Sequence, residues 1–150
     1  MQRVLFVCTH NSARSQMAEG LLRHHGGDRF QAFSAGTEPG SVHPLAIRAM
    51  AEIGIDIGGQ DSKSVDEFTG QAFDCVITVC DQAREACPVF PGAARQLHWS
   101  LEDPSRAGGS EKSRLESFTR VRDEIRTHIQ QFISEQASEK SGGSRTWEHR

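Results

Sequence analysis

The chemistry of this chain begins at Cys8, which five residues separate from Arg14. The apolar run Val4-Leu5-Phe6-Val7 before it is typical of a buried parallel strand, and a helical pattern follows from Ser15. A tight loop between a strand and a helix directs its backbone N–H groups inward, at the positive end of the helix dipole. Phosphate, arsenate or sulfate fits such a loop. The sequence therefore predicts an oxyanion-binding loop with a cysteine nucleophile inside it.

The residue types of this loop suit that chemistry. Arg14 offers a planar fork that can hold two oxyanion oxygens. The positive field of the loop favours a thiolate at Cys8, and the Ser15 hydroxyl can donate a hydrogen bond to it. Asn11 tolerates the left-handed backbone that bending the loop requires. We expect oxyanion contacts from the whole loop, which comprises Thr9, His10, Asn11, Ser12, Ala13, Arg14 and Ser15.

Cys80 and Cys87 form a second candidate group. Seven helical residues span about 10 Å, whereas a disulfide needs Cα atoms closer than about 7 Å. If the segment is helical, it must unwind before the two thiols can bond. Such a pair suits a redox relay, although two ordinary half-buried cysteines remain the alternative. A zinc site is disfavoured because the chain has no Cys-x2-Cys pair and no tight Cys/His cluster.

Two further residues have simpler expectations. Cys75 alternates into the core of its strand and is expected to act as a small hydrophobic residue. Asp103, before Pro104, is a loop carboxylic acid that can protonate an oxygen leaving group if it lies near Cys8. An Asp-Pro pair is also a common turn signal, so its catalytic role depends on that proximity.

Hydrophobic periodicity predicts the elements that position these residues. We expect strands over residues 3–7, 30–34, 74–79 and 96–99, and helices over 15–25 and 44–53. Shorter helices are expected near 65–68 and over 81–87, and a last helix from Ser113, where Glu116 completes a capping box. The alternation predicts an α/β class: a three-layer α/β/α fold around a four-stranded parallel sheet. Ligands bind beyond the carboxyl ends of such strands, where Cys8 and Cys80 lie if their strands are neighbours.

Length and composition limit the function classes. The chain has 150 residues and a net charge of −3, which predicts one catalytic domain over 1–135 and no nucleic-acid surface. Residues 136–150 are mostly Ser, Gly and charged residues, and they predict a disordered tail. The sequence shows neither a membrane span nor a signal peptide, so we expect a cytoplasmic protein without membrane partners. In that compartment its four cysteines are expected to be catalytic, metal-binding or inert rather than structural disulfides.

Several stretches together carry a family pattern. They are Cys8-Thr9-His10-Asn11-Ser12-Ala13-Arg14-Ser15-Gln16-Met17-Ala18-Glu19-Gly20, Ser34-Ala35-Gly36, Cys80…Cys87-Pro88 and His98-Trp99…Asp103-Pro104. The chain resembles the thioredoxin-coupled arsenate reductases, which share the fold of the low-molecular-weight protein tyrosine phosphatases. The resemblance runs from the first strand to about Ile133. Both branches share the nucleophile loop, whereas the pair Cys80 and Cys87 belongs to the reductase branch.

The resemblance implies a mechanism. Cys8 attacks arsenate held by the loop and Arg14, and Asp103 protonates the departing oxygen. Cys80 then attacks the Cys8 sulfur, so that arsenite leaves. Cys87 next attacks Cys80, which frees Cys8, and reduced thioredoxin reopens the Cys80–Cys87 disulfide. The resemblance implies no bound cofactor or metal.

The departures from the pattern matter for these expectations. His10 stands where the family loop usually has glycine, and Ala13 stands where many relatives have another cysteine. Some members bind potassium through residues matching Asn11, Glu19 and Ser34 and a downstream acid, near whose place this chain has Lys63. We expect its ammonium to stand in for the cation, so that potassium does not stimulate the reaction.

Two other functions remain as alternatives. A low-molecular-weight phosphatase needs Cys8, Arg14 and Asp103 but not Cys80 or Cys87. A non-enzymatic arsenic or redox sensor is disfavoured, because no helix-turn-helix and no basic nucleic-acid patch is visible.

Overall fold

The computed structural model describes residues 1–81, 90 and 93–142. The strands are β1 (Gln2–Cys8), β2 (Phe30–Gly36), β3 (Phe73–Thr78) and β4 (Ala93–His98), and the α-helices are α1 (Arg14–Gly26), α2 (Pro44–Ala51) and α3 (Glu111–Gly142). The 3₁₀ turns are η1 (Gly27–Arg29), η2 (Val65–Phe68) and η3 (Pro104–Arg106). The helix expected over 81–87 lies outside the described residues from position 82 onward.

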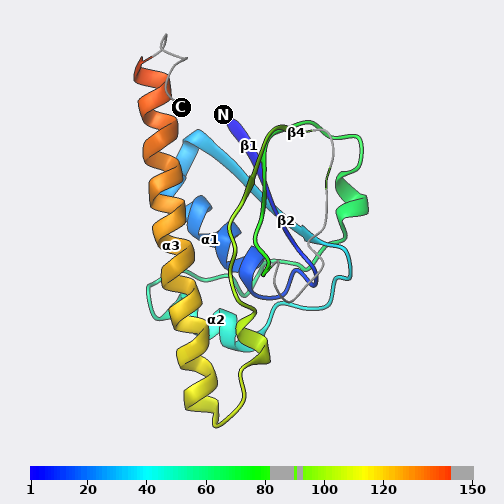
Figure 1. The fold of residues 1–150 in the computed structure, drawn as a ribbon, viewed down its shortest axis with the longest axis vertical. Helices are drawn as coiled ribbons and strands as arrows, with labels where there is room; N and C mark the ends of the chain where they lie inside the picture. The colour runs from blue at the N-terminus through cyan, green and yellow to red at the C-terminus, as the bar shows by residue number, and fades with distance from the viewer. Residues whose placement is uncertain (82–89, 91–92, 143–150) are drawn as a thin grey trace.

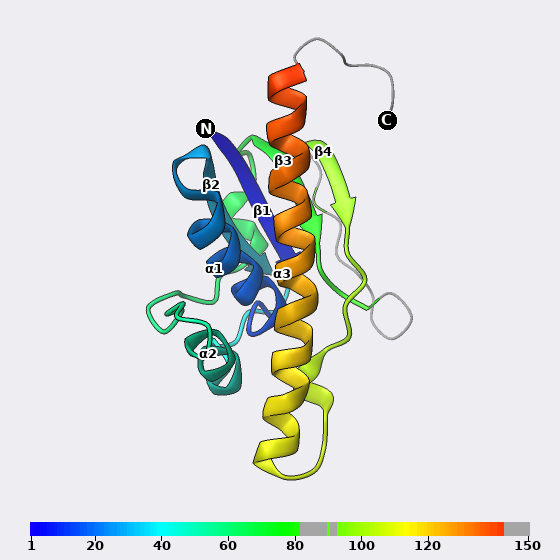
Figure 2. The same cartoon turned by 90° about the vertical axis from the view of Figure 1, so that its left-hand side faces the viewer.

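The strands form one four-stranded parallel sheet in the order β2-β1-β3-β4, which confirms the predicted fold class. Helices α1 and α3 lie side by side over one face of this sheet, and α3 follows the long axis of the molecule (Figures 1 and 2). Phe68 of η2 and Phe90 pack on the other face. Among the described helices, none combines the length and the apolar character needed to cross a bilayer.

The strand order determines where a ligand can bind. From β1 the chain crosses to β2 on one side of the sheet, and β3 then lies on the other side of β1. The order therefore reverses between β1 and β3, which is the place where ligands bind in open α/β sheets, beyond the carboxyl ends of the strands. Cys8 ends β1, and Cys80 follows β3 closely. The expectation that the strands bearing these cysteines are neighbours is confirmed.

The main core lies between the sheet and the helices. The apolar period of the last helix predicts one buried face. Leu115 is partly buried against this core, and the other five of the six side chains on that face are buried: Phe118, Val121, Ile125, Ile129 and Phe132. They meet Leu21 and Leu22 of α1 and the inward side chains of β1 and β3 in a single apolar cluster. Close packing in this cluster fixes the direction in which α1 leaves the nucleophile loop.

Both ends of α3 differ from the sequence-based expectation. The helix begins at Glu111, because the Ser110 hydroxyl accepts the Ser113 N–H at 3.1 Å, so the expected capping box of Ser113 and Glu116 is wrong. At the other end the helix continues to Gly142, past the domain limit expected at residue 135. Gln136 is buried there and accepts a hydrogen bond from Gln2 at 2.9 Å. Residues 136–142 of the expected tail thus continue α3, and residues 143–150 lie outside the described residues, so the disordered tail stays a prediction.

Candidate active site

The Cys8 sulfur lies at the centre of the loop between β1 and α1. The Asn11 backbone N–H donates to Cys8 Sγ at 3.3 Å, and the Ser15 hydroxyl lies 2.9 Å from the same atom. Ser15 Oγ also accepts a hydrogen bond from the Asn11 side chain, so its own proton is available to the sulfur. Two donors that converge on one buried sulfur stabilise a thiolate.

The bend that brings Asn11 to the sulfur has the expected conformation. Asn11 has φ of 51°, and it is the one non-glycine residue with positive φ among those described. Helix α1 then starts without a side-chain cap and without an acidic residue in its first turn. Its first N–H groups are therefore directed at the loop, where an anion complements both the groups and the helix dipole.

Arg14 and Asp103 meet beside this loop, although they are distant in sequence. Arg14 is buried, its Nη1 donates to the Leu101 carbonyl at 3.0 Å, and its Nη2 lies 3.7 Å from Asp103 Oδ2. The other oxygen of Asp103, Oδ1, accepts hydrogen bonds from the backbone N–H of Ser105 at 3.0 Å and from its hydroxyl at 2.6 Å. Asp103 thus has one oxygen fixed and the other facing Arg14.

Gly36, at the end of β2, lets the nucleophile loop approach the sheet. A Cβ atom at this position would lie 2.6 Å from the Thr9 carbonyl oxygen and 2.8 Å from the Asn11 nitrogen. The following residues bind the loop through the Glu38 N–H to the Thr9 carbonyl and the Gly40 N–H to the His10 carbonyl. The exposed His10 ring contacts the Glu38 carbonyl through Nδ1 at 3.1 Å.

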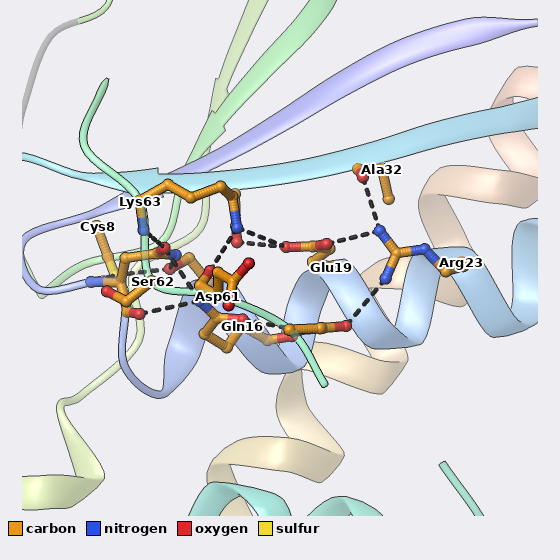
Figure 3. A network of polar contacts seen from close by, with 12 residues as sticks. Cys8, Gln16, Glu19, Arg23, Ala32, Asp61, Ser62 and Lys63 are labelled. Carbon is orange, nitrogen blue, oxygen red and sulfur yellow. Dashed lines mark hydrogen bonds and ion pairs between the residues drawn. The ribbon is translucent and has the colours of Figure 1, made fainter. Parts of the chain in front are cut away.

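A partly buried polar network lies beside the nucleophile loop (Figure 3). Gln16 Nε2 donates to the backbone and the side-chain oxygens of Asn11, each at 3.0 Å. Gln60 in turn donates to Gln16 Oε1 at 2.7 Å and accepts from Arg23 at 3.0 Å. Sequence reasoning missed Gln16 and Gln60 as supporting residues, because a buried glutamine and a distant loop glutamine have no local pattern that links them.

Lys63 lies in the same network. Its backbone N–H donates to Asn11 Oδ1 at 2.7 Å, and its ammonium donates to the Asp61 carbonyl and lies 3.8 Å from Glu19 Oε1. Glu19 also accepts hydrogen bonds from Arg23 and from Ser34. A cation thus occupies the neighbourhood of Glu19, as expected from the sequence. The insensitivity of the reaction to potassium stays a prediction.

Of the other three cysteines, Cys75 and Cys80 lie among the described residues. Cys80 is fully buried and disulfide-bonded, whereas Cys8 and Cys75 carry free thiols. Cys87 lies outside the described residues. Cys75 is buried in β3, where burial raises the pKa of its thiol to about 11, which agrees with its expected role as a core residue.

Two residues that contact the site, His43 and Ser105, were not singled out from the sequence. The His43 backbone N–H donates to the Ser12 carbonyl at 2.9 Å, which ties the start of α2 to the loop. Ser105 could have been found from its position two residues after an Asp in an Asp-Pro turn, where a side-chain cap is common. No such local signal exists for His43.

The low molecular weight phosphotyrosine protein phosphatase family matches residues 3–142. An arsenate reductase of Halalkalibacterium halodurans is 43% identical over 129 residues, which cover 86% of this chain and 93% of that protein. A solved arsenate reductase in the phosphate binding state has a TM-score of 0.78 and 36% identity, and covers 90% of this chain and 98% of its own. A thioredoxin-dependent arsenate reductase from Corynebacterium glutamicum has a TM-score of 0.59 and 31% identity, with 87% of this chain and 62% of that one covered. The chain therefore belongs to the low molecular weight phosphotyrosine protein phosphatase family, in its arsenate reductase branch.

Proposed function

We propose that this protein reduces arsenate to arsenite through Cys8, Cys80 and Cys87, and that thioredoxin returns the electrons. One observation above all supports the proposal: Cys8 ends β1, Cys80 follows the neighbouring β3, and Cys80 is disulfide-bonded while Cys8 is free. A phosphatase needs only the first of these cysteines. The relatives named arsenate reductases support the substrate, and the thioredoxin-dependent relative supports the electron donor.

The first step is attack on arsenic. The Cys8 thiolate displaces an oxygen of arsenate while Arg14 and the N–H groups of residues 9–15 hold the other oxygens. Asp103 donates a proton to the departing oxygen, which leaves as water. The fixed Oδ1 of Asp103 leaves Oδ2 as the atom that carries this proton.

The second step is reduction. Cys80 attacks the Cys8 sulfur, the sulfur–arsenic bond breaks, and its electron pair stays on arsenic, which leaves as arsenite. Cys87 then attacks Cys80 and releases Cys8 as a thiolate. The dithiol of reduced thioredoxin supplies two electrons to the Cys80–Cys87 disulfide. Because the chain must be reduced again after every turnover, we assign it to a reducing compartment, the cytoplasm.

Mass spectrometry after a single arsenate turnover without reductant tests this relay. We expect one equivalent of arsenite, a Cys80–Cys87 bridge and free thiols at Cys8 and Cys75. The variant Cys87→Ser is expected to lose thioredoxin-coupled turnover but to keep any weak phosphatase activity, while Cys75→Ser, the matched control, keeps both. Phosphate ester hydrolysis without arsenite formation would instead favour the alternative, a low-molecular-weight phosphatase that uses Cys8, Arg14 and Asp103.

A further inference from the structure

Ser105 binds one oxygen of Asp103 with two donors. Asp103 caps the 3₁₀ turn η3, and its Oδ1 accepts the Ser105 backbone N–H at 3.0 Å, a contact open to any residue at this position except proline. The Ser105 hydroxyl donates to the same oxygen at 2.6 Å. This second contact is a property of the serine side chain rather than of the turn.

The other oxygen of Asp103, Oδ2, faces the guanidinium of Arg14. Oδ2 and Arg14 Nη2 are 3.7 Å apart, which is longer than a hydrogen bond, so this contact sets the direction of Oδ2 only loosely. Arg14 itself is fixed, because it is buried and donates to the Leu101 carbonyl at 3.0 Å. The orientation of the Asp103 carboxyl group therefore depends on the short contacts at Oδ1.

This orientation decides which oxygen of Asp103 holds its proton. The torsion about the Cβ–Cγ bond of an aspartate is broad and nearly two-fold, so a carboxyl group held by one contact exchanges its two oxygens easily. Two donors use both lone pairs of Oδ1, and a proton on that oxygen would have to displace one of them. The Ser105 hydroxyl thereby leaves Oδ2, the oxygen beside Arg14, as the place for the proton.

We propose that Ser105 is a positioning residue for Asp103, whose acid proton its hydroxyl keeps on Oδ2, toward the oxyanion that Arg14 binds. This inference rests on the proposed function, in which Asp103 protonates the departing oxygen. As Cys8 forms its bond to arsenic, an arsenic–oxygen bond breaks, and the Oδ2 proton moves to that oxygen, which leaves as water. Asp103 remains as a carboxylate.

The hydrogen bond from Ser105 changes in strength during this step. Its acceptor is neutral before the proton transfer and charged after it, and a charged acceptor makes the stronger bond. An interaction that strengthens as the reaction proceeds lowers the barrier without tightening the binding of the substrate. Loss of the hydroxyl is therefore expected to slow mainly those reactions whose leaving group needs a proton.

Two aryl phosphates separate proton donation from other roles of Ser105. Phenolate is a poor leaving group and needs the proton, whereas p-nitrophenolate spreads its charge into the nitro group and depends on the proton much less. We expect Ser105→Ala to lower kcat/KM by about tenfold for phenyl phosphate and by about twofold for p-nitrophenyl phosphate. Ser105→Thr, the matched variant that keeps a hydroxyl, should restore both values. Equal falls with the two substrates, or no fall with either, overturn the proposal.

Removal of the acid gives an independent readout. In Asp103→Asn there is no proton to position, so the further change Ser105→Ala is expected to leave kcat/KM for phenyl phosphate where it is. Single-turnover arsenite formation should follow the same pattern, with a rate about tenfold lower in Ser105→Ala alone and no further loss in the Asp103→Asn background. Losses that multiply in the double variant contradict a role through Asp103.

The substrates also separate this proposal from the function on which it rests. If the unmodified protein forms no arsenite, the proposed function fails, and the aryl phosphates still decide the role of Ser105. If arsenite forms but no rate depends on the Ser105 hydroxyl, the proposed function stands and the positioning role fails. A protein that reacts with neither arsenate nor the aryl phosphates overturns both.

Discussion

Cys8 differs from an ordinary strand-end cysteine through the donors around its sulfur. The Asn11 N–H donates to it, and the Ser15 hydroxyl is oriented by the Asn11 side chain so that its proton faces the sulfur. Hydrogen bonds to a charged acceptor contribute more than those to a neutral one, so these contacts stabilise the thiolate more than the thiol.

Ser15→Ala removes one of these donors. We expect alkylation of Cys8 by iodoacetamide at neutral pH to slow by about tenfold, the equivalent of about 1.4 kcal/mol less stabilisation of the thiolate. Peptide mass spectrometry after timed labelling measures the rate at Cys8 alone. Ser15→Thr is the matched control because it keeps the hydroxyl, and equal rates in all of these proteins would contradict the role of Ser15.

Local sequence was enough to find some of these residues and not others. Cys8, Arg14 and Ser15 lie in one loop whose spacing and flanking elements are visible in the sequence, and Asp103 follows from its Asp-Pro turn and the family resemblance. His43 and Gln60 reach the loop from segments that are distant in sequence. Their partners are set by tertiary packing, which no periodic pattern encodes.

At the scale of elements, the end of β2 decides whether the loop can form. Strand β2 extends to Gly36, two residues past its expected end, because it pairs with β1 as far as Cys8. The pairing brings the Gly36 backbone against Thr9 and Asn11, where no side chain fits. A helix start that depends on such a close approach is sensitive to a single methyl group.

Gly36→Ala is therefore expected to lower the free energy of unfolding by about 1–3 kcal/mol, since backbone atoms rather than flexible side chains must move. The displaced loop should also reduce single-turnover arsenite formation by at least about tenfold. Urea unfolding and rapid quench measure the two effects. In the control variant Gly40→Ala, the added Cβ has no atom within 4 Å, so both quantities should stay near those of the parent.

The limits of α3 show why element boundaries are harder to predict than faces. The buried face follows from an apolar period, and it is confirmed from Phe118 to Phe132. The start depends on which serine caps the helix, and Ser110 does so after a turn in which Gly109 has φ of 97°. Toward its other end, Gln136 is bound by the distant Gln2. Neither partner is apparent from the local sequence.

At the scale of the whole molecule, three partly buried histidines affect how stability depends on pH. His25 belongs to α1, His43 packs on Phe118, and His128 of α3 stacks on Trp99 with the ring centres 4.8 Å apart. Burial is the largest cause that lowers the pKa of each of these rings. The unfolded chain therefore binds protons more readily than the folded one in the range just below pH 6.5.

We expect the stability contributed by these histidines to be fully present above pH 6.5 and to decrease as the pH falls below it. Urea unfolding should then show a lower midpoint at pH 5.5 than at pH 7.5. His128→Phe keeps a ring against Trp99 but cannot titrate, so the difference between its two midpoints should be smaller. A midpoint difference in His128→Phe as large as in the parent would exclude His128 from the effect.

The buried thiol of Cys75 has a consequence for how disulfides are exchanged in this protein. It lies at the centre of the sheet, paired through its strand with Val4 on one side and Arg95 on the other, and burial keeps its pKa near 11. Another thiol or disulfide can react with Cys75 only when the sheet itself opens. In the proposed relay, repeated oxidation would thus not draw Cys75 into a dead-end disulfide, and the rate at which Cys75 is labelled would report global opening of the fold.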